Sequence, residues 1–278
     1  MLAAVRWLVL AGEVDDFSGA LDPWLAFREV LVDRGDWVAR FIREQTVQTN
    51  EVQRCWILLP LFLTVAQAAP RPLDLIELGT SGGLNLFWDR YHYRYEAGTW
   101  GDPNAPLQLA GEERSPVPAA LLDVTVQVRR RRGIDLSPID VTTEEGIRLL
   151  RSFDTREEHR ARLEQAAEVI RSDPPELIRG DYLDVLPPLL AERDDSALTV
   201  VFQTLSTVYL TDEQRARLRS IIEVAAAEGP LAWISTPTPE EHGQRRGDYP
   251  VEVALWPDLT ASIAARMNVR GEWIEWVG

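Results

Sequence analysis

The stretch L-D-L-I-E-L-G-T-S-G-G-L-N-L-F-W-D-R, residues 73–90, decides the fold. Its apolar run at 73–78 predicts a buried strand, the glycines after it predict a tight turn, and the sequence from residue 84 predicts a helix. Such a unit presents backbone N–H groups and a positive helix end at the carboxyl edge of a parallel sheet, where α/β proteins bind ligands. We therefore expect a ligand site at Glu77–Gly83.

Strands and helices alternate after this unit. This rhythm predicts an α/β fold with a doubly wound, mostly parallel sheet and helices on both faces. Near the C-terminus, V-E-V-A-L-W and R-G-E-W-I-E-W-V flank a helical stretch at 259–267 and predict an antiparallel edge strand. The other expected strands are 124–128 (continuing through the arginines), 177–181, 198–203 and 231–236, and the expected helices open at Thr142, Thr155 and Thr211.

The domain organisation follows from changes in residue pattern and composition along the chain. Residues 1–70 have a helical pattern and predict an N-terminal helical cap, in which Asn50 and Gln53 cap the apolar run that follows them. Residues 71–278 form the sheet domain. Within it, the segment 91–118 is rich in tyrosine, proline and glycine and predicts an inserted hairpin or lid.

Composition excludes several kinds of partner and chemistry. The 29 basic residues face 44 acidic ones, and the net charge of −15 argues against nucleic acid as a partner. Every basic residue is arginine, so chemistry that needs a lysine amine, such as a Schiff base to pyridoxal phosphate, is excluded. The single cysteine, Cys55, excludes an internal disulfide and a cysteine-rich zinc site.

The longest apolar run, 56–69, is shorter than the roughly twenty residues that span a bilayer, so we expect no membrane segment. The first residues lack the basic leader and cleavage site of a signal peptide, which predicts a cytoplasmic protein.

The spacing of small residues in the glycine turn indicates which ligand it binds. A dinucleotide fingerprint starting at Gly79 would need glycines where Ser81 and Leu84 stand. The alternative spacing, an acid with small residues two, four and six positions on, is met by Glu77, Gly79, Ser81 and Gly83. It resembles the first motif of Rossmann-like, class I S-adenosylmethionine-dependent methyltransferases, which implies S-adenosylmethionine as cofactor, with Gly82 and Asn85 as further contacts.

Two later segments resemble the same superfamily. In G-I-D-L-S-P at 133–138 the resemblance implies that Asp135 accepts hydrogen bonds from the ribose hydroxyls. In G-D-Y-L-D-V-L-P at 180–187 it implies that Asp181 meets the adenine amino group and that Tyr182 flanks the ring. The interval from Gly79 to Asp135 exceeds the roughly twenty residues of a Rossmann unit, so the segment 91–118 must loop out.

A closer resemblance covers most of the chain. The blocks at 48–54, 77–91 and 131–141 resemble the bacterial domain-of-unknown-function 2332 family. That family carries no established activity, so the resemblance implies a fold and leaves the reaction open. Where its members often carry a histidine after the fourth strand, this chain has Gln203.

Residues outside the cofactor motifs are candidates for contact with the acceptor. Glu51 and Gln203 are the catalytic candidates, although a glutamine can orient an acceptor and cannot act as a base. Helix capping around residue 50 and core packing around residue 88 are the alternative interpretations. The substrate-binding candidates are Asn50, Arg54, Trp88, Arg90 and Tyr91.

The leading hypothesis is thus an S-adenosylmethionine-dependent methyltransferase that acts on a small-molecule acceptor. A methyltransferase-like binding module without turnover is an alternative. A serine hydrolase is another, because G-T-S-G-G fits G-x-S-x-G with Ser81 as nucleophile and His159 or His242 downstream. A nucleotide-dependent oxidoreductase is disfavoured by the missing glycines. The sequence specifies neither the acceptor nor the oligomeric state.

Overall fold

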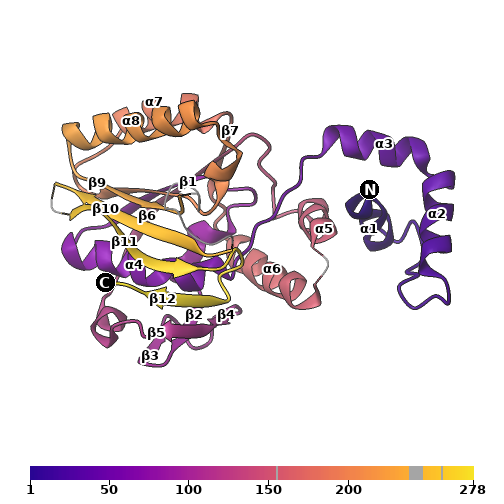
Figure 1. Cartoon of the computed structure of the whole chain (residues 1–278), viewed down its shortest axis with the longest axis horizontal. Coiled ribbons are helices and arrows are strands. Elements are labelled where there is room, and N and C mark those ends of the chain that lie inside the picture. Colours follow the sequence, from indigo (N-terminus) through magenta and orange to yellow (C-terminus); the bar gives the residue numbers. More distant parts are fainter. Residues whose placement is uncertain (155, 238–246, 258) are drawn as a thin grey trace.

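The computed structural model describes residues 1–154, 156–237, 247–257 and 259–278. Over these residues the centre of the molecule is a sheet of nine strands (Figure 1). The strands are β1 (Leu73–Leu78), β5 (Glu112–Ser115), β6 (Val128–Asp135), β7 (Glu176–Arg179), β8 (Leu198–Phe202), β9 (Leu231–Ser235), β10 (Tyr249–Trp256), β11 (Leu259–Met267) and β12 (Trp273–Trp276), and their order across the sheet is β5-β12-β11-β10-β9-β8-β1-β6-β7.

One half of the sheet is parallel, as the alternating sequence predicts. The strands β9, β8, β1, β6 and β7 pair in parallel, and β1 lies between β8 and β6 with all six residues buried. Strand β6 begins at Val128, later than expected, and runs through the arginines to Asp135. The carboxyl ends of β1, β6, β7 and β8 therefore meet at one edge, where we expect the ligand site.

The other half is antiparallel except for its outermost pair, β12 and β5, and is larger than the single edge strand we expect from sequence. Strand β10 pairs antiparallel with β9, β11 with β10, and β12 with β11. The helix expected at 259–267 is wrong, because these residues form β11 between two strand partners. Sheet pairing overrides the helical propensity of this alanine-rich segment.

Helices cover both faces of the sheet, as predicted (Figure 1). Neighbouring residues of β1 point to opposite faces: Leu75 belongs to the core beneath helix α4 (Arg54–Ala68), and Ile76 to the core beneath α7 (Tyr182–Ala191) and α8 (Asp212–Glu228). Helix α6 (Glu157–Ile170) lies on the α4 face, joined by α5 (Glu144–Phe153).

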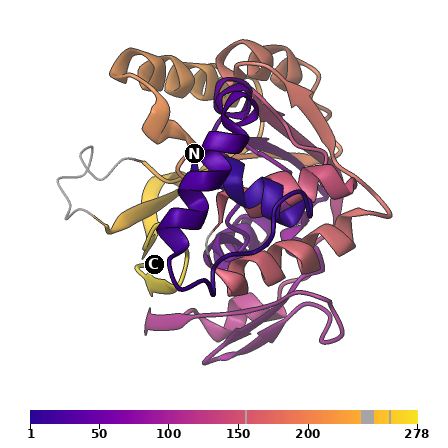
Figure 2. The same cartoon turned by 90° about the vertical axis from the view of Figure 1, so that its right-hand side faces the viewer.

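The N-terminal helices α1 (Leu2–Leu10), α2 (Pro23–Asp33) and α3 (Gly35–Glu44) stand apart from the sheet, beyond α5 (Figures 1 and 2). Their apolar side chains form two small clusters, centred on Ala4 and Leu8. Helix α4 differs from them, because its side chains lie in the main core. Of the predicted helical cap, only the first three helices therefore lie outside the sheet layers.

The segment 91–118 builds structure of its own. Strands β2 (His92–Tyr95), β3 (Gly98–Trp100) and β4 (Gln108–Ala110) form a small second sheet, and β5 then joins the main sheet beside β12. Three short 3-10 helices complete the described elements: η1 (Leu84–Arg90) in place of the helix expected after the glycine turn, η2 (Ala119–Asp123) and η3 (Ser206–Tyr209). No helix among the described residues is long and apolar enough to cross a membrane.

Candidate functional site

The turn after β1 needs glycine at defined places. Gly79 and Gly83 have φ of 71° and 75°, in the left-handed region that favours glycine, and Ser81 adopts it too, at 54°. A Cβ on Gly79 would lie 2.5 Å from the Cβ of Ser206, and one on Gly82 would lie 2.5 Å from Val141. The small residues therefore let the turn fit tightly against the chain segments that follow β8 and β6.

Two polar side chains hold the turn. Asn50 Oδ1 accepts hydrogen bonds from the N–H groups of Gly82 (3.1 Å) and Leu84 (3.4 Å). Asp135 Oδ2 accepts one from the N–H of Ser81 (2.9 Å). The predicted capping role of Asn50 is therefore wrong, because Gln53 is the N-cap residue of α4 and Asn50 caps the glycine turn instead.

Glu77 lies at the end of β1 with 2% of its surface exposed. Its carboxyl group accepts hydrogen bonds from Thr80 Oγ1 (2.6 Å) and Asn85 Nδ2 (3.2 Å). Burial is the main cause that raises the pKa of Glu77 to about 8, and the two hydrogen bonds offset only part of it. At neutral pH this side chain is therefore mostly uncharged.

A cavity of about 630 Å³ lies at this edge of the sheet, within the range of roughly 300–1,000 Å³ that small-molecule sites occupy. It brings together residues that the sequence separates widely. Those of the predicted cofactor residues that line it are Glu77, Gly79, Ser81, Asn85, Asp135, Asp181 and Tyr182.

One hydroxyl group on this wall, Ser81 Oγ, is buried without a hydrogen bond among the described residues. Burial raises the pKa of Tyr182 to about 12, and the interaction of its hydroxyl with Ser206 offsets part of this rise. Asp181 beside it is the N-cap residue of α7, where its Oδ1 accepts from the N–H of Leu183 (2.9 Å). Buried hydroxyls usually find partners, so a ligand with polar groups would suit this wall.

The rest of the lining comes from other segments, in which Asn50 and Arg54 are predicted substrate-binding residues and the remaining residues are not predicted. The chain before α4 supplies residues 46–50, and α4 itself supplies Arg54. The connection after β8 supplies residues 204–206 and 208–210, and α8 supplies Gln214. Tyr249 of β10 and Val269, which follows β11, complete the lining. The position of residues 204–210 directly after a buried parallel strand is the signal by which they could have been found.

Three predicted substrate-binding residues lie away from this cavity. Trp88 and Tyr91 are fully buried, and Trp88 stacks on Phe62 of α4 with ring centroids 4.3 Å apart. The Tyr91 hydroxyl donates to the carbonyl of Leu84 (2.6 Å). Arg90 forms an ion pair with Asp173. The structure therefore gives Trp88 and Tyr91 a packing role and Arg90 a surface pair.

The two predicted catalytic residues also lie outside the cavity. Gln203 is buried, where its Nε2 donates to the carbonyl of Thr236 (3.2 Å) and its Oε1 accepts from the N–H of Ser206 (3.1 Å). Its amide is therefore occupied in fixing the connection after β8. Glu51 lines an adjoining cavity of about 330 Å³ that shares Asn50 and Arg54 with the first, and there its Oε2 lies 3.1 Å from His159 Nδ1.

Histidine partners for Ser81 are not seen in the described part of the chain. The Nδ1 of His159 contacts Asp154 (2.8 Å) as well as Glu51, and that of His92 lies 3.4 Å from the carbonyl of Gly101. His242 lies outside the described residues.

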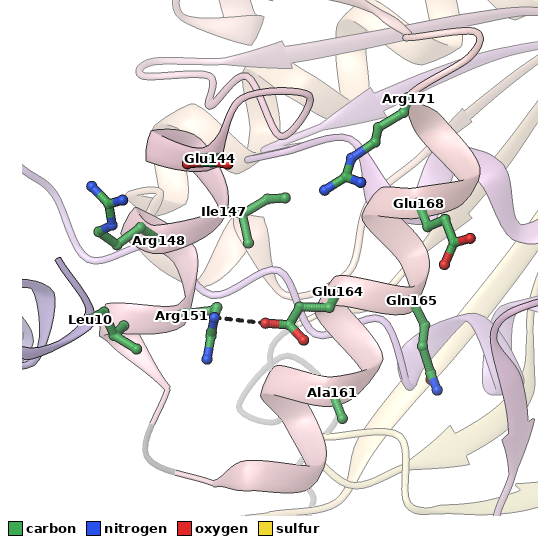
Figure 3. A pocket seen from close by; sticks show the side chains of 10 residues that line it. All are labelled: Leu10, Glu144, Ile147, Arg148, Arg151, Ala161, Glu164, Gln165, Glu168 and Arg171. Atoms are coloured by element: carbon green, nitrogen blue, oxygen red, sulfur yellow. Dashed lines mark ion pairs between the residues drawn. The ribbon is translucent and has the colours of Figure 1, made fainter. Parts of the chain in front are cut away.

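Figure 3 shows another cavity, of about 560 Å³, between α5 and α6. Its arginine and glutamate side chains come from the two helices, and Arg151 pairs with Glu164 at 2.7 Å. It holds none of the predicted site residues, and its charges of both signs favour mutual pairing. The described residues also contain no group of ligating side chains that could hold a metal ion.

Of the comparisons with known proteins, one identifies a family. Searches of curated proteins and of solved structures found no match. The model of one family, described as "Uncharacterized protein conserved in bacteria (DUF2332)", matches residues 1–276. The chain therefore belongs to this bacterial family.

Proposed function

We propose that the protein binds S-adenosylmethionine in the 630 Å³ cavity and transfers its methyl group to a small molecule. The observation that carries this proposal is the meeting of the glycine turn with Asp135, Asp181 and Tyr182 in one cavity. These are the positions at which the resemblance to Rossmann-like methyltransferases implies contacts to the ribose and the adenine.

The donors and acceptors present fit the nucleoside. Asp135 accepts one backbone N–H on each oxygen, from Ser81 (2.9 Å) and Ser137 (2.8 Å). Because each carboxylate oxygen has a second lone-pair site, both can still accept from a ribose hydroxyl. Asp181 keeps acceptor capacity beyond its bond to Leu183 for an adenine amino group.

The amino-acid end of the cofactor requires a contact other than the backbone N–H groups of the glycine turn. Asn50 already accepts from the N–H groups of Gly82 and Leu84, so these donors are occupied. Glu77 lines the cavity and carries little charge at neutral pH, because burial raises its pKa to about 8. It can therefore accept or donate a hydrogen bond there without repelling Asp135.

When bound, S-adenosylmethionine supplies a methyl group that its sulfonium activates. The protein then has to bind the cofactor, exclude water and orient the acceptor. In this proposal Asp135 holds the ribose, Asp181 and Tyr182 hold the adenine, and the lining from residues 46–50, 204–206 and 208–210 faces the acceptor.

Calorimetric titration with S-adenosylhomocysteine tests the proposal. We expect binding to the wild type, and Asp135→Asn should weaken it about tenfold, since one charged hydrogen-bond acceptor contributes about 1.5 kcal/mol or more. Asp140→Asn, an exposed residue of the same connection, is the matched control. Absence of heat from folded wild type at millimolar ligand would contradict the proposal.

The serine hydrolase is a second candidate that a specific observation favours. Ser81 has a positive φ on a turn after a strand, and its buried Oγ has no partner among the described residues. Labelling by a fluorophosphonate probe in the wild type and its loss in Ser81→Ala would support this candidate. Binding of S-adenosylhomocysteine without transfer to any screened acceptor would instead support a binding module without turnover.

A further inference from the structure

Arg54 is a buried cation on the wall of the 630 Å³ cavity. Its Nε donates to the carbonyl of Val269 (2.9 Å), and its Nη1 donates to the carbonyl of Thr204 (3.3 Å). These bonds fix the guanidinium between two segments of the wall, but both acceptors are neutral. Among the described residues, no carboxylate lies within 4.0 Å of Arg54, and its Nη2 makes no hydrogen bond.

The surroundings of Arg54 do not neutralise its charge. Burial is the largest cause that lowers the pKa of its guanidinium, and the carboxylates of Glu51 and Glu77 offset only part of this effect. Glu77 is itself mostly uncharged at neutral pH. Arg54 is also the first residue of α4, where the positive end of the helix dipole disfavours a cation. A buried cation without an ion-pair partner is costly, so an anionic ligand group would be stabilised here.

The mouth of the same cavity is apolar. Five apolar side chains that line it are exposed to solvent: Val47 (75%), Leu136 (71%), Val208 (41%), Tyr209 (82%) and Val269 (42%). They come from four segments, which precede α4 and follow β6, β8 and β11. We call these five residues the apolar rim. Exposed apolar side chains gathered at one opening are typical of a surface that a ligand covers.

We propose that this part of the cavity binds an apolar monocarboxylate, with its carboxylate on Arg54 and its apolar body against the apolar rim. The inference rests on the proposed function in taking this molecule as the methyl acceptor. A guanidinium matches a carboxylate in geometry and charge. A carboxylate oxygen carries no proton at neutral pH, so it would form the O–CH3 bond of a methyl ester while the S–CH3 bond of the sulfonium breaks and the neutral thioether S-adenosylhomocysteine leaves. This transfer needs no general base, which agrees with the positions of Glu51 and Gln203 outside the cavity.

The first arm of the test uses the wild type alone. Calorimetry at pH 7 compares 3-phenylpropionate with its neutral amide, which has the same apolar body. We expect the acid to bind about tenfold more tightly or better, because a hydrogen bond between two charged groups is stronger than one to a neutral amide. Equal affinities for the acid and the amide would overturn the inference, and this arm depends on no variant that could fail to fold.

The second arm uses variants. Arg54→Gln should abolish the preference for the acid, and Arg54→Lys should retain part of it, because the charge remains. Tyr209→Ser should weaken the acid and the amide alike. Arg90→Gln, which removes a surface arginine paired with Asp173, is the matched control and should change neither affinity.

The cofactor's own carboxylate is the other source of this chemistry, and a third arm separates the two. If Arg54 bound the carboxylate of the cofactor, Arg54→Gln would weaken the binding of S-adenosylhomocysteine but not that of 5′-methylthioadenosine. In that case 3-phenylpropionate would also compete with S-adenosylhomocysteine for binding. Those results would overturn the assignment to the acceptor. An Arg54-dependent preference for the acid in a protein that does not bind S-adenosylhomocysteine would instead support the carboxylate site and contradict the proposed function.

Discussion

Replacing Glu77 by glutamine should stabilise the protein in a way that depends on pH. The pKa of Glu77 rises from the ordinary 4.5 to about 8 in the folded chain, mainly because the carboxyl is buried. Well below pH 4.5 the carboxyl is protonated in both the folded and the unfolded chain, so it does not lower the free energy of unfolding. As the pH rises the unfolded chain releases this proton first, so stability is lost progressively up to about pH 8 and stays constant above it.

The size of the effect follows from the shift. One pKa unit corresponds to about 1.4 kcal/mol, so ionisation of Glu77 lowers the free energy of unfolding by roughly 3 to 4 kcal/mol between pH 5 and pH 8. Glutamine has the shape of the protonated acid and can still accept from Asn85 and donate to Thr80. Glu77→Gln should therefore remove this part of the pH dependence.

Urea unfolding at pH 5, 6, 7 and 8, followed by the fluorescence of the ten tryptophans, measures the difference between the two proteins. Other groups titrate in the same window, so the quantity of interest is wild type minus variant. Glu223→Gln on the exposed side of α8 is the control and should show a constant difference. A constant difference for Glu77→Gln as well would refute the buried, mostly uncharged state of this side chain.

Three further substitutions test the packing around the site. Gly79→Ala should cost about 1–3 kcal/mol, because its Cβ meets Ser206 and its φ is positive, and Ser206→Gly should restore part of this in urea unfolding. Asn50→Ala should cost about 1–3 kcal/mol by the same assay and speed hydrogen exchange of the glycine turn, since it removes the acceptor of two N–H groups. Trp88→Ala should cost about 3–5 kcal/mol, yet the remaining folded protein should bind S-adenosylhomocysteine like the wild type, because the ring stacks in the core.

The sequence predicts the parallel half of the fold well, for a local reason. The run 73–78 is apolar, short and followed by glycines, so its strand and turn are specified by neighbouring residues alone. Asp135 and Asp181 follow later strands, and parallel pairing then places both at one edge. Their common cavity is thus a consequence of topology that a pattern of strands can anticipate.

The remaining features depend on contacts that are distant in the sequence. Strand β11 has a helix-like composition, and its pairing with β10 and β12 decides its structure. Glu51 faces His159 instead of the cavity, and Gln203 bonds with the carbonyl of Thr236. Trp88 turns into the core because η1 is a short 3-10 helix beside α4. Whether such a residue lies in the core or in the site depends on tertiary packing, and a local sequence pattern does not specify that packing.

The walls of the cavity come from both ends of the chain: Val47 and Arg54 precede the first strand, and Tyr249 and Val269 come almost last. The opening is therefore complete only when the C-terminal strands have docked on the early helix. A compound bound there would contact both early and late segments of the polypeptide. Its binding free energy would therefore raise the free energy of global unfolding, and it would slow the detachment of β10 and β11 from α4.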